Sequence, residues 1–179
     1  MRILAMVAMM AVGMSALAEW KVAVYVDNDA APGRVLLGAM ATADRMFSSA
    51  GVKLDWRGHA PDGGRLPVGA VAIGLAPRTP AGFMPGALAF ARPYDGVHIT
   101  VFYDRVQHVA PRPAPAAALL AHVLVHEIAH ILQGIDRHSE SGVMKARWTG
   151  PDYTGMAWKP LPFTPEDIDL IHRGLGSRL

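Results

Sequence analysis

The chain has 179 residues, of which 51% are apolar and 18% are charged, a composition that supports about one domain with a hydrophobic core and excludes a disordered chain. Its 17 basic and 15 acidic residues leave a net charge of only +2, with no basic tract, so the composition gives no support for a nucleic-acid partner. Cysteine is absent, which excludes disulfides.

The N-terminus has the features of a cleaved signal peptide. Arg2 precedes an apolar run, and small residues follow, with Ala16 and Ala18 in the positions read by signal peptidase. The alternative is a membrane anchor, for which this uncharged stretch is marginal in length. We therefore expect residues 1–18 to be removed. Residues 19–179 would then form one exported domain, secreted or periplasmic in a bacterium, with no membrane association.

The first half of the mature chain alternates between strand and helix patterns. A helix is predicted over 33–51, where apolar residues recur at helical spacing and Ser-Ser-Ala-Gly provides a stop. Segments rich in alternating or β-branched apolar residues predict strands at 20–28, 52–57, 68–76, 87–93 and 96–106. The fourth of these is short and is expected at the edge of the sheet.

A long apolar helix follows a proline-rich linker at 110–115. This helix is predicted over 116–134, because Gly134 can adopt the left-handed conformation that ends a helix. After an irregular stretch, a final helix is predicted with Thr164 as its N-cap, Pro165 at its first position and Asp167 completing a capping box.

The long helix carries the pattern H-E-x-x-H at His126, Glu127 and His130. Histidines four residues apart lie on one helix face, where two imidazoles can bind one zinc ion at ~2.0–2.1 Å. A carboxylate beside the first ligand can take a proton from a zinc-bound water and pass it to a leaving amine. The alternative, two incidental histidines, is weaker because unpaired histidines are costly to bury in an apolar helix. We therefore predict one catalytic Zn²⁺ with Glu127 as general base.

A catalytic zinc site usually has three protein ligands, so a third is expected downstream. The candidates are Asp136, His138, Glu140 and Glu166, and a turn at Gly134 allows a residue shortly after it to reach the metal. His138 fits best by chemistry and distance. Asp136 is its rival, because carboxylates also bind zinc, and Glu166 is a more distant alternative.

The segment HEIAHILQGIDRHSESGVM, residues 126–144, resembles the metzincin clan of zinc peptidases. The clan signature is H-E-x-x-H-x-x-G-x-x-H followed by a methionine-containing turn, and the parts occur here in the same order. Gly134 comes one residue later than in that signature and His138 two residues later, with Met144 in the turn. This lengthened spacing is similar to that of a group of secreted bacterial metzincin-like proteins.

The resemblance implies an α+β, zincin-like fold with a twisted mixed sheet, an active-site helix and a C-terminal helix. It implies a monomeric, zinc-dependent endopeptidase acting on a peptide or protein. Met144 would form a hydrophobic floor beneath the metal without binding it, and residues 87–91 would pair with extended substrate. A tyrosine that some metzincins carry two residues after this methionine is replaced by Ala146, and a role for Tyr153 stays open. The alternative is a zinc-binding protein without useful turnover.

Overall fold

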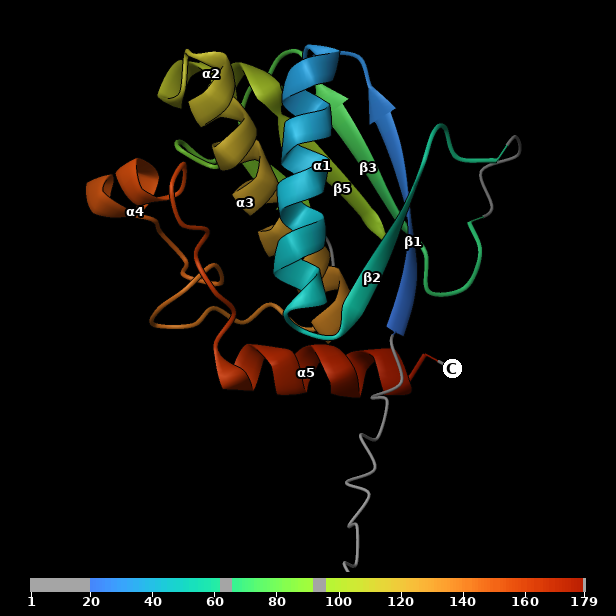
Figure 1. Cartoon of the computed structure of the whole chain (residues 1–179). Coiled ribbons are helices and arrows are strands. Elements are labelled where there is room, and N and C mark those ends of the chain that lie inside the picture. The colour runs from blue at the N-terminus through green and yellow to red at the C-terminus, as the bar shows by residue number, and fades with distance from the viewer. Residues whose placement is uncertain (1–19, 62–65, 92–95, 179) are drawn as a thin grey trace, which may run out of the picture.

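One five-stranded sheet organises the computed structural model, which describes residues 20–61, 66–91 and 96–178 (Figure 1). The strands lie in the order β2-β1-β3-β5-β4, and only β4, which is antiparallel to β5, departs from the parallel arrangement. Their bounds are β1 (Trp20–Asn28), β2 (Val52–Arg57), β3 (Val71–Ala76), β4 (Ala89–Ala91) and β5 (His98–Phe102). The predicted signal peptide, residues 1–18, lies outside the described residues.

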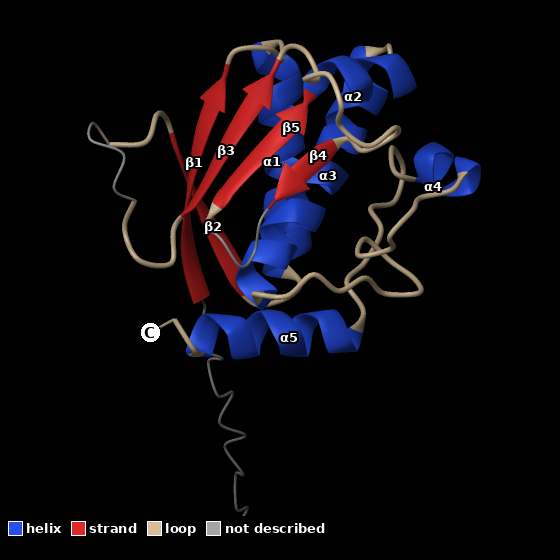
Figure 2. Cartoon of the chain, turned by 180° about the vertical axis from the view of Figure 1, so that it is seen from behind, coloured by secondary structure: helices blue, strands red, loops and turns tan. Residues whose placement is uncertain are grey.

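Two helices, α1 (Gly33–Ser48) and α3 (Pro113–Gln133), cover the same face of this sheet (Figures 1 and 2). The buried face of α1 follows the predicted helical spacing and consists of Val35, Ala39, Ala43, Met46 and Phe47. The two helices pack against each other over much of their length. The mixed sheet with helices on one face confirms the α+β prediction.

Helix α3 forms the centre of the core. Of its 21 residues, 15 are buried, so buried side chains lie around most of its circumference. Its length and composition would allow it to cross a membrane, but 78% of its most apolar window is buried inside the molecule. This burial identifies α3 as the core helix of the protein. Helix α3 starts three residues before the predicted boundary. Pro113 and Pro115 fit its first turn, where backbone N–H groups have no partner in the helix.

The C-terminal helix α5 (Pro165–Gly176) lies across the end of α3 that follows the H-E-x-x-H pattern (Figure 1). The capping box is present as predicted. The Thr164 hydroxyl accepts from the Asp167 N–H, and the Asp167 carboxylate accepts from the Thr164 N–H.

The prediction of a strand through residue 106 was wrong, because β5 ends at Phe102 and helix α2 (Tyr103–Val109) begins directly after it. Tyr103 and Val106 are both buried, a helical spacing within the predicted strand. Asp104 also binds Thr79, a contact over 25 residues that no local pattern reveals. A second short helix, α4 (Gly150–Gly155), starts in the segment expected to be irregular, with a capping box between Thr149 and Asp152.

Candidate metal centre

Three histidine side chains from two parts of the chain converge at one point. His126 and His130 lie one turn apart on α3, and their Nε2 atoms are 3.0 Å apart. His138 joins them from the segment after the helix, so that one nitrogen of each ring lies within 4.8 Å of the other two. Among the described residues this is the only such group of potential metal ligands, and it contains neither Asp136, Glu140 nor Glu166.

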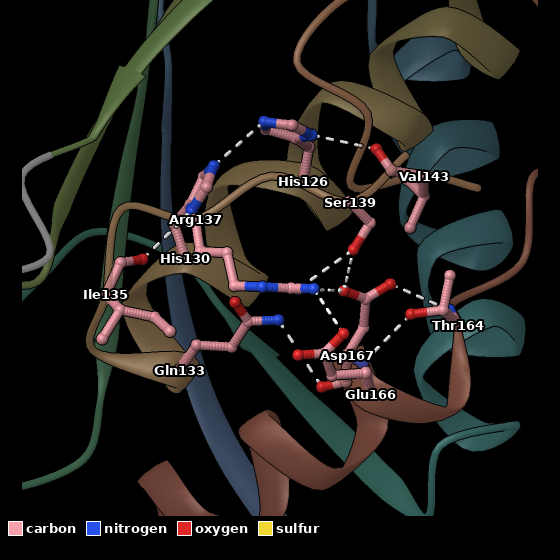
Figure 3. A network of polar contacts seen from close by, with 10 residues as sticks. All are labelled: His126, His130, Gln133, Ile135, Arg137, Ser139, Val143, Thr164, Glu166 and Asp167. Carbon is pink, nitrogen blue, oxygen red and sulfur yellow. Dashed lines mark hydrogen bonds and ion pairs between the residues drawn. The ribbon is translucent and has the colours of Figure 1, made fainter. Parts of the chain in front are cut away.

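The two helical histidines are held in a defined tautomer by backbone carbonyls (Figure 3). The Nδ1 of His126 lies 2.9 Å from the Val143 oxygen, and the Nδ1 of His130 lies 3.3 Å from the Ile135 oxygen. A carbonyl oxygen can only accept, so each Nδ1 carries the proton and donates it. Both Nε2 atoms therefore face each other with lone pairs, an arrangement that a cation between them would satisfy.

The surrounding protein keeps these imidazoles neutral. Burial lowers the pKa of His126 to about 3, with a further contribution from the neighbouring His130. Burial also lowers the pKa of His130. A neutral imidazole is the form that binds a metal. Two nitrogens bound to one tetrahedral zinc ion lie roughly 3.3 Å apart, close to the observed separation of the Nε2 atoms.

The turn at Gly134 brings His138 back to the helix. Gly134 has the left-handed conformation predicted for it, with φ 70° and ψ 18°, and its N–H donates to the His130 oxygen at 2.9 Å. The turn places the Ile135 carbonyl on His130. The ring centre of His138 then lies 4.9 Å from that of His130 and 5.3 Å from that of His126. The lengthened spacing is therefore compatible with three clustered histidines.

The carboxylates of Glu166 and Asp136, considered as alternative ligands, lie outside the group of three histidines. Glu166 forms an ion pair with Arg137 at 2.5 Å, and its side chain is 61% exposed. Asp136 is exposed at the surface and contributes to the electrostatics of Glu127.

Glu127 is partly buried in the cleft beside His126. Burial, together with the charge of Asp136, raises the pKa of the Glu127 carboxyl to about 7. A carboxyl group that titrates near neutral pH can both take up and release a proton under those conditions, as a general base that later acts as an acid must do.

A cleft of about 450 Å³ opens above these residues, with His126, Glu127 and His138 in its lining. Its lining also includes residues 84–89, which end at the first residue of the edge strand β4, and residues 145–148. No described strand pairs with the outer side of β4. The predicted edge position of this strand is therefore confirmed.

Tyr153, whose role the sequence left open, lies in the wall of this cleft on α4. Its side chain is 37% exposed, and its ring lies 6.3 Å from that of Trp148. The helix that carries Tyr153 has a capping box between Thr149 and Asp152, and Asp152 also forms an ion pair with Lys145 at 2.5 Å.

The methionine turn follows the three histidines in the chain, as the sequence predicts. Met144 is fully buried, and its carbonyl accepts from the Ser139 N–H at 2.8 Å. The preceding carbonyl, that of Val143, accepts from both His126 and the Trp148 indole. Gly142 permits this turn with φ 75°, and a side chain there would collide with the Pro162 carbonyl.

Comparison with known proteins finds similarity in three-dimensional structure. No protein-family model matches the chain, and a search of curated proteins finds no match. Among solved structures, archaemetzincin from Methanopyrus kandleri is similar with a TM-score of 0.62 and 16% sequence identity, over 94% of this chain and 99% of that one. This likeness confirms the predicted zincin-like fold.

Proposed function

We propose that this chain is a secreted zinc-dependent endopeptidase of the metzincin type. In this proposal His126, His130 and His138 hold one zinc ion, and Glu127 acts as the general base. Three histidine imidazoles suit zinc, and they leave a coordination position for chemistry. The zincin-like fold and the cleft above the histidines support this assignment.

The observation that carries the proposal is the facing pair of Nε2 atoms on α3. They lie 3.0 Å apart, and each ring presents its Nδ1 proton to a carbonyl on the opposite side. Two hydrogen-bond acceptors this close repel each other, and a cation between them would satisfy both lone pairs.

A bound zinc ion supplies Lewis-acid chemistry, polarising the scissile carbonyl and lowering the pKa of water. Glu127 takes a proton from the attacking water while the water oxygen bonds to the carbonyl carbon. As the C–N bond breaks, Glu127 passes this proton to the leaving nitrogen.

The substrate in this proposal is an extended peptide or protein segment. No described strand pairs with the outer side of β4, which lies beside the cleft, and an extended chain can add to such an edge as a further strand. If β4 is an ordinary edge strand without such a role, changes that block its backbone groups will leave peptide affinity unaffected.

The test is metal analysis of the purified mature protein, residues 19–179, together with cleavage of an unbiased peptide library. We expect about one zinc ion per chain, cleavage within peptides, and loss of cleavage after chelation that zinc restores. A protein that holds zinc and cleaves nothing would be a zinc-binding protein without turnover. A protein that holds no metal would refute the proposal.

Export is the part of the proposal that depends on residues 1–18. The exported protein should begin at Glu19 when its N-terminus is determined by mass spectrometry, because the cleavage signal ends at Ala18. An intact N-terminus in the membrane fraction would establish the anchor instead.

A further inference from the structure

The two neighbours of His138 in the chain are tied to the same buried carboxylate on α5 (Figure 3). On one side, the Ser139 hydroxyl donates to Asp167 Oδ1 at 2.5 Å. On the other side, Arg137 Nη1 lies 3.4 Å from the same oxygen and donates to the Ser139 hydroxyl at 3.2 Å. His138 is thus the middle residue of a three-residue stretch whose ends share one anchor.

Asp167 is held firmly enough to act as that anchor. Its side chain is fully buried, and its second oxygen, Oδ2, accepts from the Thr164 N–H at 2.8 Å. Both oxygens are therefore in use, and a buried carboxylate that lost these partners would be strongly disfavoured. The carboxylate is consequently fixed with respect to α5, which itself packs against the end of α3.

One backbone hydrogen bond, from the Ser139 N–H to the Met144 carbonyl at 2.8 Å, also holds the stretch that contains His138. The side chain of His138 is exposed, whereas His126 and His130 are buried on the core helix. Both of its flanking residues, by contrast, contact Asp167 across 28 to 30 residues of sequence. Hydrogen bonds to a buried charged group are stronger than those between neutral groups.

We propose that Asp167 is a positioning residue that fixes the backbone on both sides of His138, through Ser139 and Arg137, and thereby sets the affinity for the metal. The proposal rests on the zinc site proposed above. It distinguishes Asp167 from its neighbour Glu166, whose contact with Arg137 is a surface ion pair at a 61% exposed side chain and contributes little.

Two single substitutions separate positioning from helix capping. Ser139→Ala removes the link to Asp167 and leaves the capping box of α5 intact. Thr164→Ala removes the hydroxyl that accepts from the Asp167 N–H and leaves the Ser139 link in place. Glu166→Gln serves as a third, surface control.

Zinc affinity is measured on each mature protein by competition with a chromophoric chelator, alongside the melting temperature. We expect Ser139→Ala to weaken zinc binding by about 10–100-fold, as is typical for residues that orient a ligand. Thr164→Ala should lower the melting temperature without changing zinc affinity, and Glu166→Gln should change neither. The visible spectrum of the Co²⁺-substituted proteins should change for Ser139→Ala alone, because only that variant displaces a ligand.

Unchanged zinc affinity in Ser139→Ala would overturn the inference. The inference would also be overturned if zinc affinity followed the melting temperature, so that Thr164→Ala bound zinc as weakly as Ser139→Ala. A wild-type protein that binds zinc and cleaves no peptide would refute the peptidase function while these affinities still test the role of Asp167. A wild-type protein that binds no zinc would refute both.

Discussion

Helix α3 and the segment that follows it, residues 134–163, build the same site by opposite means. On α3, 15 of 21 residues are buried, and the core fixes His126 and His130 in place. In the segment only five of 30 residues are buried: Ser139, Val143, Met144, Met156 and Phe163. This segment is held largely by hydrogen bonds, and it brings His138 to the histidines of the helix.

The two regions are stabilised by different kinds of interaction. The helix supplies apolar burial, which is roughly proportional to area and tolerant of small changes in shape. The segment supplies directional contacts, including the Val143 and Ile135 carbonyls that set the tautomers of the helical histidines. We therefore expect substitutions inside α3 to change mainly stability, and substitutions in the segment to change mainly the metal site.

The largest effect is expected at Glu127, the proposed general base, which lies on the helix. Glu127→Ala should lower kcat/KM about 10²–10⁴-fold, because the proton carrier is lost, and leave zinc content unchanged. Steady-state kinetics and metal analysis of the same preparation measure both. Glu140→Ala is the matched control, since this exposed glutamate belongs to the segment and is absent from the cleft lining. Undiminished turnover in Glu127→Ala would refute the assigned mechanism.

The second-largest effect is expected at His138, the ligand proposed for the segment. His138→Ala should weaken zinc binding by more than the roughly 100-fold limit typical of outer residues, because a direct ligand is lost. Asp136→Asn should lose at most about 10–100-fold, since Asp136 lies outside the histidine group. Chelator competition distinguishes the two variants. The reverse ranking would mean that the chain meets the metal two residues earlier.

The difference between the helix and the segment also explains which features could be predicted from the sequence. The pattern of α3, the stop at Gly134 and the capping box of α5 are local signals, so they were found from residues close together in the chain. The bond from Ser139 to Asp167 spans 28 residues and follows no periodicity. Asp167 was consequently predicted only as a cap. Helix α2 was missed for a related reason, because the Asp104 contact with Thr79 is not local.

Backbone geometry in the segment gives a smaller effect. Gly142→Ala should lower the free energy of unfolding by about 1–3 kcal/mol, because φ 75° disfavours a side chain and the new Cβ meets the Pro162 carbonyl. It should also weaken zinc binding, since the next residue supplies the carbonyl for His126. Gly155→Ala is the control, as no atom lies within 4 Å of a Cβ there. Denaturant titration of both variants should show a loss for Gly142→Ala alone.

The smallest effect is expected inside the core helix. Ile131 is fully buried on α3, directly after His130, and Ile131→Val removes one methylene group without changing the shape of the backbone. Such a change lowers the free energy of unfolding by about 0.5–1.5 kcal/mol. Zinc affinity should stay as in the wild type, because neighbouring core side chains hold the helix and its two histidines. Urea titration and chelator competition on this variant and on Ser139→Ala should then give opposite rankings. If Ile131→Val weakened zinc binding as much as Ser139→Ala does, the packing of α3 would itself set the ligand geometry, and the proposed separation between core and segment would fail.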